Sequence, residues 1–303
     1  MFRDEASKGN FVIADQTLSA LELLEADRIA AIKNVERLTS LIEEISPATK
    51  AVVEGPDFWN EKLGFEWLIG GQLAKQSVSM LVADPGLGKT TLMAQMTLSL
   101  STGRSFLGSP PAPAARTLLI QAEGSRGAFQ GRWRSACEAM GIEQSETRGW
   151  FIQADGSRDF FRDFEIGSRG FERVIEQSRA QLVILDTIGF FAQFNENDPN
   201  EWREKVMKPL RRCSIKTGVS FVLVHHQPKI TDSNRDNRDG RGTSAMLGDC
   251  DHFWRLERVK DEQGLRDFVV RKNKYGTEET LRLSFDLGNA IFRPANVPIK
   301  EKP

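Results

Sequence analysis

A glycine-rich stretch near the middle of the first half of the chain carries the residue types that bind a triphosphate. Residues 83–90 run Ala-Asp-Pro-Gly-Leu-Gly-Lys-Thr and match the phosphate-loop pattern at every position but the first, where alanine replaces glycine. Gly86 and Gly88 let successive backbone N–H groups point at phosphates, and the helix that follows adds the positive end of its dipole. A methyl group at Ala83 is tolerated unless φ is positive there, so we expect the loop to bind nucleotide.

The side chains of this loop have separate expected roles. Lys89 is expected to reach the β- and γ-phosphates, and the Thr90 hydroxyl to bind Mg²⁺. The alternative is a turn that only links a strand to a helix, which the intact Gly-Lys-Thr-Thr sequence and its position argue against. The predicted nucleotide-binding residues are Asp84, Pro85, Gly86, Leu87, Gly88, Lys89, Thr90 and Thr91.

Three other apolar runs end in polar residues that belong beside a bound nucleotide. Asp186 ends one run and is predicted to hold Mg²⁺ with Thr90. Glu123 follows another run, where it is expected to orient and deprotonate an attacking water; the alternative is an exposed turn glutamate. His225 and His226 end the third run, and because strand side chains alternate, only one of them can face the phosphates.

These side chains require a sheet whose strands end together. From about residue 65 on, short apolar runs alternate with helical patterns, and continuous apolar runs of this kind favour a mainly parallel sheet covered on both faces. The last two runs alternate better and are expected to form an antiparallel edge. The predicted strands are 78–83, 117–122, 182–186, 219–226, 268–272 and 281–286.

The N-terminal part differs in pattern from the rest. Residues 16–46 place leucines and isoleucines at helical spacing, which predicts one or two amphipathic helices that end before Pro47. Such a helix either packs on its own domain or serves as an arm for oligomerisation or a protein partner. We therefore predict a helical segment over residues 1–50, a linker over 51–64 and one α/β phosphate-loop domain over 65–303.

Composition excludes several classes of protein. The chain has 303 residues, with 41 Lys and Arg against 42 Asp and Glu, so a nucleic-acid site must be local rather than a general basic field. Three widely spaced cysteines disfavour a disulfide framework or zinc site and are typical of a reducing compartment. No apolar stretch is long enough to span a bilayer, so we expect a cytoplasmic protein without a membrane partner.

The order of phosphate loop, strand-Glu, strand-Asp and strand-His resembles the RecA-like ATPase core over about residues 67–276, and particularly the RepA-like and DnaB-like hexameric helicases of plasmids and phages. The resemblance implies ATP and Mg²⁺ as cofactors and a hexameric or similar ring with nucleotide between subunits. The stretch LVHHQPK resembles the strand end where these helicases place a γ-phosphate-sensing His or Gln, and His226 matches it best.

Two further stretches extend the resemblance. RKNKYG, residues 271–276, resembles the segment whose basic residues reach a neighbouring subunit's nucleotide, which assigns this role to Lys272 and Lys274. Lys274 stands where many members have an arginine; lysine keeps the charge but loses the bidentate fork. Residues 241–258 resemble the segment that leads from a DNA-facing loop into a helix and a strand, so we predict contacts to single-stranded DNA from Lys229, Arg235, Arg238 and Arg241.

The charge of this loop leaves an alternative open. The four basic residues face three aspartates, a net charge of only +1, and a solvated connector has the same composition. Two functions follow. One is an ATPase motor, a DNA helicase or translocase acting on single-stranded DNA in replication or recombination. The other is a nucleotide-controlled assembly factor or switch that recruits protein partners through the N-terminal helices.

Overall fold

The chain divides into two units, Met1–Gly64 and Phe65–Pro303. The computed structural model describes residues 24–35, 55–61, 64–147, 149–153, 162–196, 198–226 and 241–298. In the first unit, residues 24–35 form a helix, in agreement with the predicted N-terminal helical segment, and Gly55–Asn60 form the short helix α3. Every residue of both helices is exposed within the chain. No helix in these described ranges is long and apolar enough to cross a membrane.

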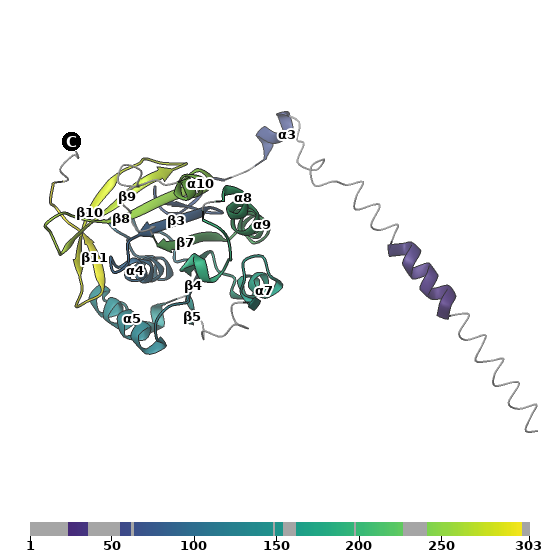
Figure 1. Cartoon of the computed structure of the whole chain (residues 1–303), viewed down its shortest axis with the longest axis horizontal. Coiled ribbons are helices and arrows are strands. Elements are labelled where there is room, and N and C mark those ends of the chain that lie inside the picture. The colour runs from purple at the N-terminus through teal and green to yellow at the C-terminus, as the bar shows by residue number, and fades with distance from the viewer. Residues whose placement is uncertain are drawn as a thin grey trace, which may run out of the picture. The chain divides into compact units, whose positions relative to one another are not determined.

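The second unit is built on a nine-stranded sheet with the strand order β11-β10-β9-β8-β3-β7-β6-β4-β5 (Figure 1). The strands from β5 to β8 in this order are parallel, and β9, β10 and β11 are antiparallel. The predicted fold, a mainly parallel sheet with an antiparallel C-terminal edge, is confirmed. The strands span Val78–Ala83 (β3), Thr117–Gln121 (β4), Gly149–Gln153 (β5), Leu182–Asp186 (β6), Ser220–His226 (β7), His252–Arg258 (β8), Leu265–Asn273 (β9), Thr280–Asp286 (β10) and Ile291–Pro294 (β11).

The sequence prediction missed two strands and shortened a third. β5 and β11 are short strands at the two edges of the sheet, and neither has an apolar run long enough to stand out. β9 is longer than predicted because it is paired on both sides, with β8 and β10, beyond its apolar run. A separate two-stranded sheet, β1 (Trp67–Ile69) with β2 (Leu73–Ala74), precedes β3.

Helices cover both faces of the sheet (Figure 1). On one face, α4 packs Leu92 and Met96 against strand residues such as Ile184. On the other, α7 and α9 pack Phe171 and Leu210 against the residues that alternate with these. The helical elements are α4 (Lys89–Thr102), α5 (Arg126–Met140), η1 (Gln144–Glu146), α7 (Arg169–Ser178), η2 (Ile188–Phe190), α8 (Pro199–Trp202), η3 (Arg203–Met207), α9 (Lys208–Thr217) and α10 (Arg241–Asp249).

Candidate nucleotide site

The strand register brings the ends of four neighbouring strands to one level. Ala83 of β3 is opposite His226 of β7, and Asp186 of β6 is opposite Val224 of β7 and Gln121 of β4. We call this level, where β3, β7, β6 and β4 end, the carboxyl end of the sheet. Glu123, which follows β4, therefore lies at the same end as the phosphate loop that follows β3. This is the part of an open α/β sheet where ligands bind.

The phosphate loop takes the backbone conformation that its glycines allow. Gly86 and Gly88 have φ of +78° and +99°, and a Cβ atom at Gly88 would lie 2.8 Å from the Phe292 ring. Glycine at 88 therefore serves both the left-handed backbone and the close approach of β11. Ala83 is a buried strand residue paired with β7, so its methyl group replaces glycine without strain.

Lys89 is folded back over the loop at the start of α4. Its side chain is 6% exposed, and Nζ donates hydrogen bonds to the carbonyl oxygens of Ala83 (2.8 Å) and Asp84 (3.1 Å) and to Nδ1 of His226 (3.1 Å). Burial lowers the pKa of Lys89, while the charges of Asp186, Glu123 and Asp84 act in the opposite direction. The ammonium group is thus enclosed by acceptors that a phosphate oxygen can replace.

His226 connects Lys89 to Glu123. Because an ammonium group can only donate, Nδ1 of His226 is the acceptor, and the proton on Nε2 faces Glu123 Oε1 at 3.3 Å. Thr187 Oγ1 donates to the same carboxylate oxygen at 3.4 Å. His225 points away from this group: its Nε2 lies 3.6 Å from Glu196, and its hydrogen bond lowers the pKa of that carboxyl.

Asp186 supplies a buried carboxylate beside the loop. It is 3% exposed, and burial raises its pKa, against the opposing effect of a hydrogen bond from Thr90. Its Oδ2 atom has no hydrogen-bond partner among the described residues. A carboxylate oxygen with free valence next to a threonine hydroxyl suits Mg²⁺, which binds proteins through one or two oxygen ligands and keeps its waters. The residues present therefore fit this ion.

The two predicted phosphate-binding lysines of RKNKYG lie at the other end of the sheet. Lys272 Nζ donates to the carbonyl oxygens of Leu247 (3.0 Å) and Gly248 (2.6 Å), and Lys274 Nζ lies 3.6 Å from Asp251 Oδ1. We call this level, where β3 begins, the amino end of the sheet. Lys274 follows β9 there, about 17 Å from the carboxyl end along a six-residue strand. A lysine side chain does not span that distance.

The predicted DNA-contact residues fall largely outside the described part of the chain. Lys229, Arg235 and Arg238 belong to residues 227–240, which the structure does not describe. Arg241 is the first residue of α10, and only its backbone is described. Contacts from these four residues therefore stay a prediction.

Comparison with known proteins places this geometry in a family. The profile of a family described as AAA domain matches residues 49–232, more than half of the chain. This chain belongs to the AAA domain family. The search of curated proteins finds no match.

Solved structures similar to this AAA domain protein include the ATPase domain of a DnaB-like helicase and the RadB recombinase. The helicase domain has a TM-score of 0.58 and 12% sequence identity, and the match covers 86% of this chain and 98% of that one. The RadB recombinase has a TM-score of 0.49 and 17% identity, covering 73% and 92%. At 12% identity the match to the helicase domain concerns the fold, which is the RecA-like P-loop ATPase fold that the sequence predicted.

Sequence reasoning missed a group of charged residues at the amino end of the sheet in this AAA domain protein. Asp251 is 1% exposed and interacts with Arg211 as well as Lys274. Its neighbour His252 is fully buried, and burial lowers its pKa to about 4. An acidic residue directly before an apolar strand is the only sequence signal of this group, and it does not reveal the partners.

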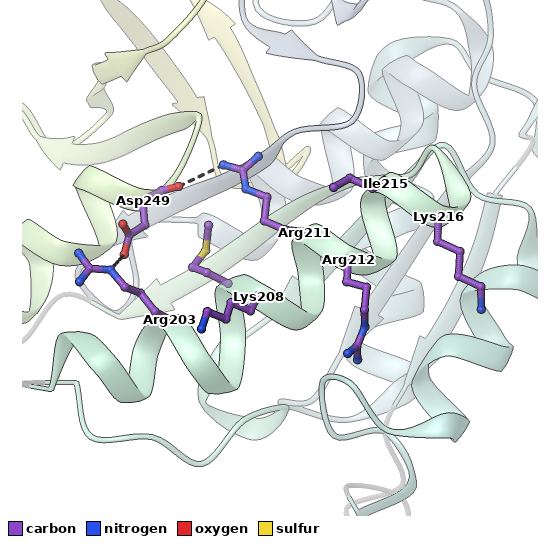
Figure 2. A pocket seen from close by; sticks show the side chains of 8 residues that line it. Arg203, Lys208, Arg211, Arg212, Ile215, Lys216 and Asp249 are labelled. Carbon is purple, nitrogen blue, oxygen red and sulfur yellow. Dashed lines mark hydrogen bonds and ion pairs between the residues drawn. The ribbon is translucent and has the colours of Figure 1, made fainter. Parts of the chain in front are cut away.

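A cavity of about 740 Å³ lies along α9 and the end of α10 (Figure 2). Basic side chains surround it, with Met207 and Ile215 as apolar parts of its wall. Arg203 Nε donates to Asp249 at 2.9 Å on one side of it. It shares no residue with the phosphate loop; its lining is Arg203, Met207, Lys208, Arg211, Arg212, Ile215, Lys216 and Asp249.

Proposed function

We propose that this AAA domain protein is an oligomeric ATPase in which neighbouring subunits share each nucleotide, working as a helicase or translocase on single-stranded DNA in replication or recombination. The observation that carries the proposal is the separation of its two sets of phosphate-binding side chains. Lys89 lies at the carboxyl end of the sheet, and Lys272 and Lys274 lie at the amino end. If both sets bind one triphosphate, they come from different subunits of a hexameric or similar ring.

In this proposal the carboxyl end binds the nucleotide and activates water. The N–H groups of the loop and Lys89 hold the phosphates of ATP, and Thr90 and Asp186 hold Mg²⁺, which neutralises phosphate charge. Glu123 is the base: its carboxylate lies at the rim of the site, where it orients a water and accepts a proton.

His226 links nucleotide binding to the base. Without a phosphate, Lys89 donates to His226, and His226 donates to Glu123. When Lys89 turns to a phosphate oxygen, His226 loses this donor and is able to bind the γ-phosphate instead, which leaves the Glu123 carboxylate available to a water. His226 is also the last residue of β7, directly before the predicted DNA-contact loop, so the same residue connects the two predicted sites.

The neighbouring subunit supplies the remaining charge. A cation donated in trans stabilises the transition state of γ-phosphoryl transfer, so hydrolysis depends on assembly. Lys274 carries this charge in the proposal: its side chain is 57% exposed, and its ion pair with Asp251 is longer than a hydrogen bond. Lys272 supports it from the same strand.

One observation favours the second candidate, an assembly factor or switch that recruits protein partners. The helix over residues 24–35 exposes four aliphatic side chains, Leu24, Ile29, Ile32 and Val35. Exposed apolar residues of this kind on an amphipathic helix are typical of an oligomerisation or partner-binding surface. In that function ATP controls assembly, and single-stranded DNA does not affect turnover.

The experiment that separates the two measures ATP turnover with and without single-stranded DNA, on protein whose oligomeric state is determined by sedimentation. We expect turnover to require assembly and to rise with DNA, and Lys89→Ala to abolish it, since the variant removes one phosphate-facing charge from a loop built mainly of backbone. Turnover that ignores DNA while ATP drives assembly supports the switch. Parent-rate turnover by Lys89→Ala excludes the phosphate-loop assignment.

A further inference from the structure

Asp251 is the residue around which the amino end of the sheet is organised. It stands between α10 and β8 and is 1% exposed. A buried carboxylate is stable only when charged or hydrogen-bonding groups compensate for the water it has lost. The groups that compensate Asp251 come from three distant parts of the chain: the start of β3, helix α9 and the end of β9.

Two of these groups fix one oxygen of the carboxylate. The Val78 amide donates to Asp251 Oδ2 at 2.9 Å, and Arg211 Nη1 donates to the same oxygen. Arg211 is itself held by a hydrogen bond from Nη2 to the carbonyl oxygen of Asp249, 3.1 Å away, as Figure 2 shows. Burial alone raises the pKa of Asp251, but the hydrogen bonds from Arg211 and Val78 outweigh it, and the pKa is lowered.

The other oxygen faces Lys274. Oδ1 has no hydrogen-bond partner in the described part of the chain and lies 3.6 Å from Lys274 Nζ. The backbone adds a second link, because the Lys274 amide donates to the Asp251 carbonyl oxygen at 3.0 Å. On its outer side Lys274 Nζ lies 5.4 Å from the centre of the Tyr275 ring. The ammonium group is thus oriented by a fixed carboxylate behind it while its outer side faces solvent.

We propose that Asp251 is a positioning residue that holds the ammonium group of Lys274 directed out of the amino end of the sheet, toward the nucleotide of a neighbouring subunit. The inference rests on the proposed trans function of Lys274. The carboxylate limits the positions that a flexible lysine side chain otherwise samples, and its 3.6 Å separation leaves the three N–H donors of Lys274 open to phosphate oxygens.

Lys272 adds a route by which the DNA-contact loop acts on the same group. It binds the carbonyl oxygens of Leu247 and Gly248 in the last turn of α10, the helix that follows the predicted DNA-contact loop and leads to Asp251. Both lysines are therefore tied to the segment 247–251. A movement of α10 changes the position of both at once.

The test is Asp251→Asn in the full chain. The amide oxygen still accepts from the Val78 amide, but the negative charge behind Lys274 is gone. We expect ATP turnover to fall roughly 10- to 100-fold, as for a misplaced reacting group, with unchanged ATP affinity. Asp249→Asn is the matched control, because Asp249 pairs with Arg203 rather than with a lysine of RKNKYG, and it should leave turnover unchanged.

Mixed assemblies distinguish positioning from a general loss of structure. Asp251→Asn with Lys89→Ala should recover turnover, since an intact phosphate loop then meets a neighbour with intact Asp251 and Lys274. Asp251→Asn with Lys274→Ala should not recover, because both defects lie in the same half of the site. Recovery with Lys274→Ala, lowered ATP affinity of Asp251→Asn, or parent-rate turnover of Asp251→Asn overturns the inference.

A second variant covers failure of Asp251→Asn to fold. Asp251→Glu keeps the charge but moves the carboxylate by one methylene, and it should show the same pattern in mixtures; parent-rate turnover of this variant also contradicts the inference. Lys274→Ala separates the inference from the proposed function. If Lys274→Ala turns over at the parent rate, the trans function fails; if it is inactive while the Asp251 variants are normal, only the positioning role fails.

Discussion

The two ends of the parallel strands treat their charged side chains differently. At the carboxyl end, Lys89, His226 and Glu123 contact one another and loop carbonyls, and Asp186 keeps an oxygen without a partner among the described residues. At the amino end, Lys272 binds two carbonyl oxygens of α10, and one oxygen of Asp251 receives two donors.

This difference separates a binding region from an anchoring one. Buried charges are stable only when they are paired, so incomplete pairing at the carboxyl end indicates groups that a ligand completes. At the amino end the buried partners are largely complete, and Lys274 is the basic side chain that extends from Asp251 toward solvent. Neither end holds both halves of a phosphoryl-transfer site.

The largest expected effect is at the carboxyl end. Glu123→Gln should lower ATP turnover by about 10² to 10⁴, the usual contribution of a general base, because the amide holds a water but does not accept its proton. ATP binding should persist and trap the ATP-bound assembly. Phosphate release and nucleotide binding measure the two effects. Glu143→Gln, at an exposed glutamate away from the site, is the control; equal rates for parent and Glu123→Gln place the base elsewhere.

The next effect tests whether the amino end serves a neighbour. Lys274→Ala should lower turnover by about 10³, the lower part of the range for a charge donated in trans. Mixed with Lys89→Ala, it should regain about a quarter of the parent turnover, because that fraction of interfaces in a random ring pairs two intact halves. A mixture of Lys89→Ala with Glu123→Gln is the control: both defects lie at the carboxyl end, and no interface is whole.

Lys274→Arg sharpens the same comparison. Arginine restores a planar, permanently charged fork, and we expect it to preserve or raise the rate if this side chain meets a γ-phosphate. Lack of recovery in verified mixed rings, together with a normal rate for Lys274→Ala, reduces RKNKYG to an ordinary basic strand end. That result favours the switch.

A smaller effect concerns how the carboxyl end is closed by the C-terminal strands. Gly88→Ala should lower the free energy of unfolding by about 3 kcal/mol, because it combines a residue at positive φ with a contact too close to Phe292. Urea unfolding measures the change. Gly127→Ala is the control, because no atom lies within 4 Å of its Cβ position in α5 and alanine favours a helix. An unchanged midpoint for Gly88→Ala contradicts the described loop.

The smallest effect tests burial at the amino end. Burial lowers the pKa of His252 to about 4, against 6.5 for an exposed histidine, while the charge of Asp251 opposes it. The unfolded chain therefore binds a proton at pH values where the folded chain does not. This contribution to stability is complete above pH 6.5 and is lost as the pH falls toward 4, by about 2 kcal/mol between pH 7 and pH 5.

Urea unfolding of the parent and of His252→Gln at both pH values isolates this contribution. The difference between the two proteins should shrink by that amount at pH 5, because the variant has no histidine to protonate at this position. A difference that does not change with pH shows that His252 is not buried in its neutral form.

The sequence alone was sufficient for the features that depend on local pattern. The phosphate loop is continuous, its backbone follows from its glycines, and the strands that carry Asp186 and His226 are unbroken apolar runs. The choice of His226 over His225 followed from a family resemblance, and the structure places His226 against Lys89. The edge strands β5 and β11 escaped prediction because pairing, rather than apolar content, defines them.

Only the tertiary structure decided which end of the sheet each charged residue occupies. The order of strands in the chain does not reveal that β8 lies beside β3 or that β9 returns antiparallel to it, and this pairing places Lys274 far from Lys89. The Asp251 contacts are likewise long-range: the Val78 amide is 173 positions away. A buried charge selects its partners by proximity in space, and sheet register, which no local pattern encodes, sets that proximity.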